Sequence, residues 1–243
     1  MITRLLIGKD RTFVQRDNGA VDTHLGRVEA DAVNSAADGA VVLSNRREAF
    51  TILTPTWLDR YQRMKRGAQI MTLKDLGFIA AACGIGPDSS VGDAGAGTGA
   101  AAIFFSRIAK HVHSFDLRAD HLELAKKNAE LMGCQNVTFE ERDIYEGVPD
   151  NQYDVFVLDN PTPWKALSHI IPAMKIGGHI VSYTPTILQA SEFANAVHQD
   201  ERLHYRKTVE LIERQWNAKD LSVRPSSDAI GHTGFLVFCR RIR

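Results

Sequence analysis

Two different patterns of apolar and polar positions divide the 243-residue chain. In residues 1–62, short apolar runs alternate with Gly, Asn and Asp, as in Asp17-Asn18-Gly19 and Asp38-Gly39. This spacing is typical of short strands that are joined by tight turns. We therefore expect a small N-terminal β domain over residues 1–62, followed by a second domain over residues 63–243.

From about residue 76 onward, apolar runs of strand length alternate with longer segments of helical periodicity. This pattern predicts strands at 90–94, 111–115, 137–141, 153–158, 179–183, 204–213 and 235–240. It predicts helices at 100–110, 122–132, 164–174 and 187–199. Short crossovers of this kind indicate an α/β fold, with a mostly parallel seven-stranded sheet and helices on both faces.

Local signals place the ends of two of these helices. Asp120 and Glu123 are spaced as in a capping box near the start of the helix at 122–132, and Gly133 follows its end. Gly177-Gly178 is expected to end the helix at 164–174.

The composition is that of an ordinary globular protein, with 44% hydrophobic and 24% charged residues. No run approaches the roughly 18 apolar residues of a membrane span, and the first apolar run is too short for a secretory signal. Three widely spaced cysteines without a CxxC favour neither a metal site nor a disulfide framework. We therefore expect a cytoplasmic protein with no metal and no membrane partner.

Net charge does not single out a nucleic-acid partner, because 29 basic residues balance 29 acidic ones. Two segments are nevertheless basic. Residues 46–74 hold seven basic and two acidic residues, and the last 43 residues hold nine and five. Such segments form either a solvated face or a surface that contacts phosphates.

The candidate chemistry begins with a glycine loop, Val91-Gly-Asp-Ala-Gly95-Ala-Gly97-Thr-Gly99-Ala100, between an expected strand and helix. Glycines there let a nucleotide approach backbone N–H groups. The spacing satisfies the dinucleotide fingerprint G-x-G-x-x-G/A. Asp93 extends it to D-x-G-x-G-x-G, the form carried by methyltransferases that use S-adenosylmethionine. The candidate cofactor contacts in this loop are Asp93, Gly95, Ala96, Gly97, Thr98 and Gly99.

Acidic residues end the next three strands. Asp116 stands where a carboxylate can accept both ribose hydroxyls, although NAD-dependent enzymes also use an acid there. Asp143 stands where methyltransferases hold the adenine amino group, and Asp159 follows the fourth strand. Each acid alone is also typical of a structural strand end. Together with the loop, they indicate a nucleotide cofactor at the C-terminal edge of the sheet.

The fourth strand leads into Asp159-Asn160-Pro161-Thr162-Pro163-Trp164. Two prolines cannot continue a strand, and they make a rigid, extended loop. We expect this loop to project Asp159 beside the methyl group of the cofactor. Trp164 is either a stacking surface for the substrate or a core residue.

Four segments, in the same order, resemble those of a known family. Residues 67–75 (GAQIMTLKD) are similar to its TQIIYPKD, and residues 157–164 (VLDNPTPW) to its LDLPEPW. Residues 183–189 (YTPTILQ) are similar to its YxPxxxQ, and Arg224-Pro225 with GHTGFLVF at 231–238 to its RP…GHTGYLTFA. His24-Leu-Gly26 and Leu53-Thr-Pro55-Thr also fit. Over nearly its whole length, the chain resembles the tRNA (adenine-N1)-methyltransferases that modify position 58 of the T-loop.

The resemblance implies a Rossmann-like class I methyltransferase domain behind the small β domain. It also implies S-adenosylmethionine as cofactor, tRNA as substrate and a homotetramer as the assembly. The family's catalytic aspartate corresponds to Asp159, which also faces the cofactor. Its cofactor contacts correspond to Gln69, the glycine loop, Asp116, Asp143 and His121.

The chain departs from the family pattern at two places. Thr72-Leu73 stand where the family often has Tyr-Pro. If that tyrosine helps to hold the target adenine, Trp164 or Tyr183 has to replace it. Gln189 and His232 are further candidate substrate contacts, with a structural role as the alternative for each. The loop at 160–163 reads Asn-Pro-Thr-Pro instead of Leu-Pro-Glu-Pro, which removes one acid.

The expected reaction transfers a methyl group to N1 of adenine 58, and the sequence leaves open whether adenine 57 is also modified. N1 has a free lone pair, so alignment matters more than a base. Asp159 is expected to accept a hydrogen bond from the N6 amino group and to stabilise the developing positive charge.

Three alternatives remain. A methyltransferase for a protein or a small molecule is compatible with the glycine loop, but the Asp159 loop and the GHTGF ending argue against it. An NAD-dependent oxidoreductase lacks a candidate hydride-transfer site and leaves Asp93 unexplained. A non-catalytic subunit is expected to lose the glycine loop and the catalytic acid, and both are present.

Overall fold

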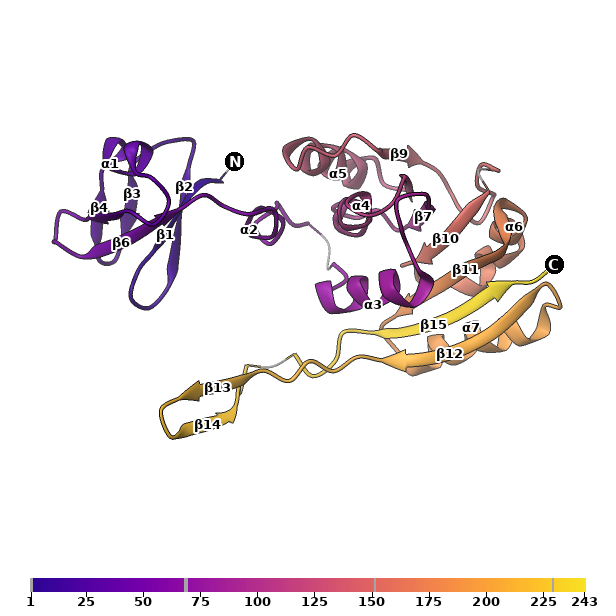
Figure 1. The fold of residues 1–243 in the computed structure, drawn as a ribbon. Helices are drawn as coiled ribbons and strands as arrows, with labels where there is room; N and C mark the ends of the chain where they lie inside the picture. The colour runs from indigo at the N-terminus through magenta and orange to yellow at the C-terminus, as the bar shows by residue number, and fades with distance from the viewer. Residues whose placement is uncertain (1, 68–69, 151, 229) are drawn as a thin grey trace. The chain divides into compact units, whose positions relative to one another are not determined.

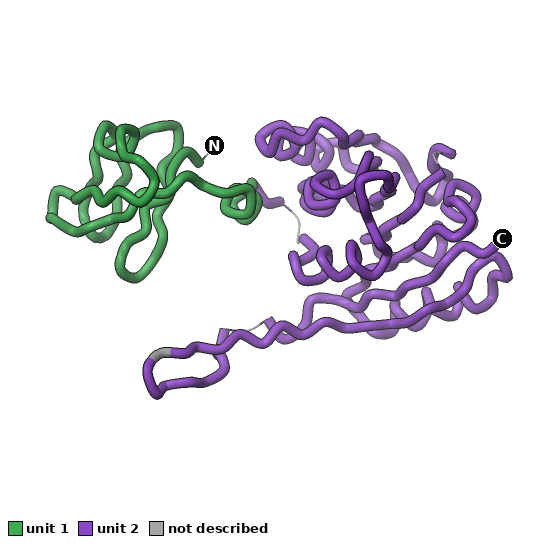
Figure 2. The backbone as a smooth tube through the Cα atoms, viewed as in Figure 1, with its two compact units in different colours: residues 1–64 green, residues 65–243 purple. Residues whose placement is uncertain are grey.

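The computed structural model describes residues 2–67, 70–150, 152–228 and 230–243. The chain divides into two compact units, residues 1–64 and residues 65–243, which are coloured separately in Figure 2. Among the described residues, no helix has the length and apolar character needed to cross a bilayer.

The first unit contains an antiparallel sheet of β1 (Ile2–Ile7), β2 (Thr12–Arg16), β5 (Val41–Leu43) and β6 (Ala49–Leu53), in the order β2-β1-β6-β5. A second pair is formed by β3 (Val21–Thr23) and β4 (Gly26–Val28). Asp17 and Asn18 have φ values of 52° and 55°, which is the left-handed turn expected from their Asp-Asn-Gly sequence. Leu6, Phe50 and Ile52 form the centre of its core.

Two short helices in this unit, α1 (Ala30–Ser35) and α2 (Trp57–Tyr61), differ from the strands expected there. Helices of five or six residues are too short to show a helical periodicity in the sequence. At α2, Thr56 and Asp59 form a reciprocal capping box, which is the local signal that marks its start.

The main sheet of the second unit is formed by β7 (Ser90–Ala94), β8 (His111–Asp116), β9 (Val137–Glu141), β10 (Tyr153–Leu158), β11 (Met174–Thr184), β12 (Leu203–Glu210) and β15 (Phe235–Arg241). Their order is β12-β15-β11-β10-β7-β8-β9. The strands from β11 to β9 pair in parallel, and β15 is antiparallel to both β11 and β12. The expected mostly parallel seven-stranded sheet is thus confirmed.

Helices cover both faces of this sheet (Figure 1). One face carries α3 (Leu73–Cys83), α4 (Ala100–Ser106) and α5 (Ala119–Leu131), and the other carries α6 (Leu167–Ala173) and α7 (Ile187–Gln199). A 3-10 turn, η1 (Pro163–Ala166), precedes α6.

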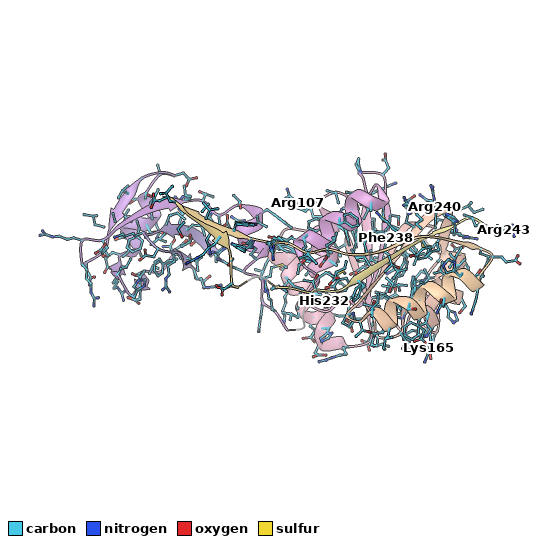
Figure 3. The ribbon with its side chains drawn as sticks, turned by 90° about the horizontal axis from the view of Figure 1, so that it is seen from below. Arg107, Lys165, His232, Phe238, Arg240 and Arg243 are labelled. Atoms are coloured by element: carbon cyan, nitrogen blue, oxygen red, sulfur yellow. The ribbon has the colours of Figure 1, made fainter. Side chains whose placement is uncertain are left out.

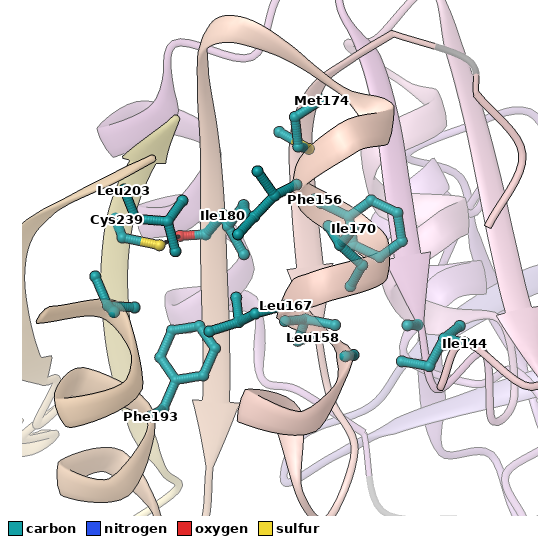
Figure 4. Close-up of a cluster of buried hydrophobic side chains, with 14 of the residues drawn as sticks. Ile144, Phe156, Leu158, Leu167, Ile170, Met174, Ile180, Phe193, Leu203 and Cys239 are labelled. Atoms are coloured by element: carbon teal, nitrogen blue, oxygen red, sulfur yellow. Dashed lines mark hydrogen bonds between the residues drawn. The ribbon is translucent and has the colours of Figure 1, made fainter. Parts of the chain in front are cut away.

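The largest side chains between the sheet and α6 and α7 form one buried cluster, part of which is drawn in Figure 4. Phe156 and Ile180 of the sheet pack in it with Ile170 of α6 and Phe193 of α7. Burying each of these side chains stabilises the fold by about 2 kcal/mol. Gly92 of β7 leaves space for Phe156, because a Cβ at Gly92 would lie 2.3 Å from its ring.

Three local expectations were wrong. The helix after β8 begins at Ala119, and Asp120 binds Arg118 with no capping box. Gly177 and Gly178 lie inside β11, where φ of Gly177 is 86°, so they do not end a helix. The strand expected at 204–213 ends at Glu210. It is followed by a hairpin of β13 (Trp216–Lys219) and β14 (Ser222–Pro225) that the pattern did not predict.

Candidate active site

A cavity of about 430 Å³ lies at the C-terminal ends of β7, β8, β9 and β10. Its volume is in the range of small-molecule sites. Six of the expected site residues line it: Gly95, Gly97, Asp116, His121, Asp143 and Asp159. The cavity thus brings together the glycine loop and the three strand-end acids, as the fold class requires for side chains at this edge of the sheet.

The glycine loop is shaped by close contacts at two of its glycines. Gly95 has φ of 95°, and a Cβ there would lie 2.1 Å from the carbonyl oxygen of Asp159. Gly99 begins α4 with φ of 80°, and a Cβ there would lie 3.1 Å from Cβ of Ala125 in α5. Gly95 therefore permits the close approach of the β10 loop, and Gly99 permits the packing of α4 on α5.

Asp116 is held in place by hydrogen bonds to both carboxylate oxygens. Oδ2 accepts from the N–H of Gly97 at 2.8 Å and lies 3.2 Å from Nδ1 of His121, and Oδ1 accepts from the N–H of Arg118 at 3.0 Å. The glycine loop, the end of β8 and the first turn of α5 thus meet at one carboxylate. This arrangement orients Asp116 in the cavity wall.

Asp159 begins the loop after β10, and its N–H donates to the carbonyl of Ala94 at 2.8 Å. Asp159 is one of the residues that line the cavity. Among the described residues, no side chain donates a hydrogen bond to that carboxylate. Burial without a partner raises the pKa of Asp159 to about 7.

Asp93 lies inside β7 and is fully buried. Its Oδ2 accepts a hydrogen bond from the Ser114 hydroxyl at 2.7 Å, and Oδ1 has no partner among the described residues. Burial raises the pKa of Asp93 to about 7, and Asp159 and Asp116 nearby act in the same direction. Asp93 precedes Gly95 of the glycine loop by two residues and is not among the residues that line the cavity.

Two other expected cofactor contacts are not among the residues that line the cavity. Ala96 and Thr98 are buried and do not line the cavity. The carbonyl of Thr98 accepts from the side chain of Asn128 at 2.9 Å, which ties the loop to α5. Gln69 lies outside the described residues.

The four expected substrate contacts do not line this cavity. Trp164 packs against the core cluster and lines a separate hollow with α7. The Tyr183 hydroxyl donates to the carbonyl of Thr233 at 2.6 Å, and Gln189 donates to the carbonyl of Pro161 at 3.0 Å. His232 contacts Glu210 through Nδ1 at 2.6 Å and the carbonyl of Pro185 through Nε2 at 2.8 Å.

His232 therefore has an acceptor at each ring nitrogen, which favours the protonated ring and raises its pKa. Figure 3 shows His232 ahead of β15, with Phe238 and Arg240 further along the strand. It connects the end of β12, the end of β11 and the segment before β15. The structure thus gives Tyr183, Gln189 and His232 structural partners.

Sequence reasoning missed a buried polar cluster at the start of α3. Asp75 is fully buried and accepts from Lys74 at 2.7 Å and from Thr72 and Thr233 at 2.8 Å each. Lys74 also donates to Thr233 at 2.6 Å. The signal was present, because these residues belong to two of the segments that carry the resemblance.

It also missed cavity residues that flank Asp143 and Asp159. Arg142, Ile144, Tyr145, Asn160 and Pro161 all line the cavity. Their position next to the two acids is the signal that could have found them. Among the described residues, no group of three His, Cys, Asp or Glu side chains forms a candidate metal site.

The cavity fits a nucleoside cofactor that carries a positive charge. Asp116 and Asp143 offer carboxylates to hydroxyl and amino groups, and Asp159 offers one without a partner. Apolar walls at Phe115, Leu117 and Ile144 suit a base. Backbone atoms of Gly95 and Gly97 in the glycine loop form part of the cavity wall.

Methyltransferases are among the solved structures and curated proteins that are similar to this chain. A SAM-dependent O-methyltransferase from Thermotoga maritima covers 100% of this chain and 93% of its own at TM-score 0.90 and 26% identity. The tRNA (m1A58) methyltransferase TrmI from Aquifex aeolicus covers 99% and 97% at TM-score 0.86 and 21% identity, which shows the fold.

A curated relative is the tRNA (adenine(57)-N(1)/adenine(58)-N(1))-methyltransferase TrmI of Methanocaldococcus jannaschii. It is 29% identical over an alignment 260 positions long, which covers 95% of this chain and 91% of the relative. The family model described as tRNA methyltransferase complex GCD14 subunit matches residues 51–223. Because this match spans most of the chain and includes the glycine loop and the Asp159 loop, the protein belongs to the tRNA methyltransferase complex GCD14 subunit family.

Proposed function

We propose that this protein transfers a methyl group from S-adenosylmethionine to N1 of adenine 58 in the T-loop of tRNA. The observation that carries the proposal is that Asp159 lines the cavity beside the glycine loop and that its carboxylate accepts no hydrogen bond from the described side chains. Family membership and the relative named for adenine 57 and 58 support the substrate.

Different residues around the cavity would bind different parts of the cofactor. The cofactor supplies a methyl group on a positively charged sulfur. Asp116, oriented by Gly97 and His121, would hold the ribose hydroxyls, and Asp143 would hold the adenine amino group. Asp93, whose Oδ1 has no partner among the described residues, would hold the amino-acid portion through water. Gln69 is proposed as a further contact.

Asp159 would accept a hydrogen bond from the N6 amino group of the target adenine. This contact orients the base and stabilises the positive charge that spreads over N1, C6 and N6 as the bond forms. The base has to leave its stack to reach the cavity, as enzymes acting on bases generally require. Trp164, which is half-buried, is proposed to contact the tRNA through its accessible part. Tyr183 is buried, so its contact with the tRNA is proposed only for a conformation that exposes its ring.

We also propose that the protein works as a homotetramer in the cytoplasm, where its tRNA substrate is processed. The β13–β14 hairpin supports assembly, because Trp216, Leu221 and Val223 on it are exposed large apolar side chains. Sedimentation of the purified protein should give four times the chain mass. A monomer that transfers methyl groups at full rate would contradict the assembly.

The direct test is methyl transfer from labelled S-adenosylmethionine to unmodified tRNA, with nucleoside analysis and mapping of the product. Label in 1-methyladenosine at position 58 is the expected result, and label at 57 as well would extend it. Tight cofactor binding without label on tRNA would disprove the substrate. In that case, protein and small-molecule acceptors with hydroxyl groups would be tested next, as the Thermotoga maritima structure suggests.

A further inference from the structure

The loop that carries Asp159 has few backbone hydrogen bonds to hold it. Residues 159–162 form neither helix nor strand, and Pro161 and Pro163 have no N–H to donate. On the β7 side, the N–H of Asp159 donates to Ala94. At the other end, the carbonyl of Thr162 accepts from the N–H of Lys165 at 3.0 Å. Side-chain contacts add to these two backbone bonds.

Tyr145 provides two of these contacts. Its phenol oxygen accepts a hydrogen bond from the Asn160 side chain at 2.5 Å and another from the Thr162 hydroxyl at 2.9 Å. Its ring packs against the buried core cluster. Gln189 of α7 adds a bond to the carbonyl of Pro161 at 3.0 Å. Tyr145 thus holds the loop on both sides of Pro161.

The backbone of Tyr145 is bound to the other end of the cavity. Its N–H donates to Oδ1 of Asp143 at 2.8 Å, in a turn that directly follows β9. Asp143 and Tyr145 both line the cavity, as does Asn160. One residue therefore connects the acid proposed to hold adenine with the loop proposed to hold the reacting base.

The two loop residues that bind Tyr145 are those at which this loop differs from the LDLPEPW segment of the family. Asn160 and Thr162 stand where the LDLPEPW segment has Leu and Glu. Leucine has no polar group to offer a phenol, and an ionised glutamate can only accept. The double contact with Tyr145 is therefore a property of the residues in this chain.

We propose that Tyr145 is a positioning residue for methyl transfer, which holds the Asp159 loop closed through Asn160 and Thr162 and keeps it in register with Asp143. The kinetic consequences of this role rest on the proposed function. Without the two bonds, the loop can move away from the cavity wall and admit water to Asp159. The carboxylate would then be hydrated and displaced from the reacting base.

Hydration of Asp159 would change a quantity that can be measured, the pKa of its carboxyl group. Burial is what raises the pKa of Asp159 to about 7, so a hydrated Asp159 has a pKa closer to the ordinary range. The titratable groups that face it are Asp93 of β7 and Tyr183 of β11. Asp116, Arg118, His121, Arg142 and Asp143 line the same cavity. None of these groups is changed when Tyr145 is replaced.

The experiment compares Tyr145→Phe with Tyr205→Phe. Tyr205 is a matched control, because it also packs against the core cluster and its hydroxyl bonds a threonine, Thr208, at 3.0 Å. For Tyr145→Phe, kcat with tRNA should fall about 10- to 100-fold, as small misplacements of reacting groups do. The Kd of S-adenosylhomocysteine should change less than about threefold. Tyr205→Phe should leave both quantities unchanged.

The pathway through the loop is tested in an Asn160→Ala/Thr162→Val background. There Tyr145→Phe should change kcat less than about twofold, because its partners are already absent. If Tyr145→Phe lowers kcat in that background by the same factor as in the unchanged protein, the proposal is overturned, since Tyr145 would then act by another route. A Tyr145→Phe variant with the kcat of the unchanged protein would overturn it as well.

A binding measurement decides the role of Tyr145 even if tRNA is not the substrate. S-Adenosylmethionine carries a positive sulfonium and S-adenosylhomocysteine does not, so the ratio of their Kd values reports ionisation of a carboxylate beside the sulfur. In the unchanged protein this ratio should titrate near pH 7, and in Tyr145→Phe about one pH unit lower. An unshifted titration would refute loop closure by Tyr145. Absence of methyl transfer to tRNA by the unchanged protein would refute only the proposed function.

Discussion

At the residue scale, Asp116 and Asp159 are both strand-end carboxylates in the wall of the same cavity. The carboxylate of Asp116 accepts two backbone hydrogen bonds and contacts His121. The carboxylate of Asp159 accepts no hydrogen bond from the described side chains or backbone. A carboxylate that is held in orientation and still has acceptor capacity suits binding of hydroxyl groups. A carboxylate that accepts no hydrogen bond from the described residues suits an interaction that forms only with a charged ligand or in the transition state.

Replacing Asp159 by Asn should lower kcat/KM about 100-fold, because the amide can orient the base but cannot neutralise the developing charge. Burial raises the pKa of Asp159 to about 7. The ionised form is the active one, so kcat/KM should rise with pH through about 7 and level off above it. In Asp159→Asn this limb should be missing. Steady-state rates between pH 5.5 and 8.5 check this, and an unchanged limb in the variant would assign it to another group.

A second residue-scale prediction concerns Gly95. Gly95→Ala should abolish methyl transfer and weaken cofactor binding at least tenfold, because its Cβ would lie 2.1 Å from the Asp159 carbonyl oxygen. Gly133→Ala is the matched control, with a positive φ of 72° but no atom within 4 Å. It should cost about 1 kcal/mol of stability through strain and leave transfer unchanged. Equal losses in the two variants would show that strain alone is responsible.

At the element scale, the start of α3 is joined to the segment before β15 by a cluster of polar side chains. Asp75 and Thr233 are 158 residues apart in sequence and share a hydrogen bond in the interior. Tyr183 of β11 extends the connection through its bond to the Thr233 carbonyl. The contact therefore links α3 and β11 with the segment before β15.

Asp75→Ala should lower the free energy of unfolding by about 3 kcal/mol, because it leaves Lys74 and two hydroxyls without their buried acceptor. Lys74→Met/Asp75→Leu should lose clearly less, since no half of the ion pair remains. Urea unfolding of the two variants measures the difference. If the double variant is as unstable as Asp75→Ala, shape and not charge explains the loss.

At the scale of the whole molecule, a net charge of zero conceals an uneven distribution of charge along the chain. Residues 46–74 hold seven basic and two acidic residues. Binding to tRNA releases counterions in proportion to the phosphates contacted, so the salt dependence of affinity counts these contacts.

Replacing Arg63, Lys65 and Arg66 by Ala should reduce the slope of log Kd for tRNA against log salt by about two to three. Replacing the exposed Lys9, Arg16 and Lys126 removes the same charge and should leave the slope nearly unchanged. Filter binding of tRNA at several salt concentrations measures both. Equal slopes in the two triple variants would show that only overall charge matters.

Much of the fold was predictable because its signals are local. The alternation from 90 to 199 and Gly133 after α5 correspond to the observed elements. The short helices α1 and α2 and the β13–β14 hairpin were not predictable from periodicity. For the site, Asp116, Asp143 and Asp159 were found because they end neighbouring parallel strands. Tyr145 lies in an irregular connection, which has no such pattern.

By itself, therefore, the sequence determined the order of strands and helices and the glycine loop, since each depends on spacing within a short segment. The tertiary structure alone decided which polar side chains face the cavity and which have internal partners. Tyr183, Gln189 and His232 bind carbonyls 28 to 50 residues away, and Tyr145 binds the Asp159 loop 15 and 17 residues away. Such partners are set by how strands and helices pack, and packing is determined by the whole chain at once.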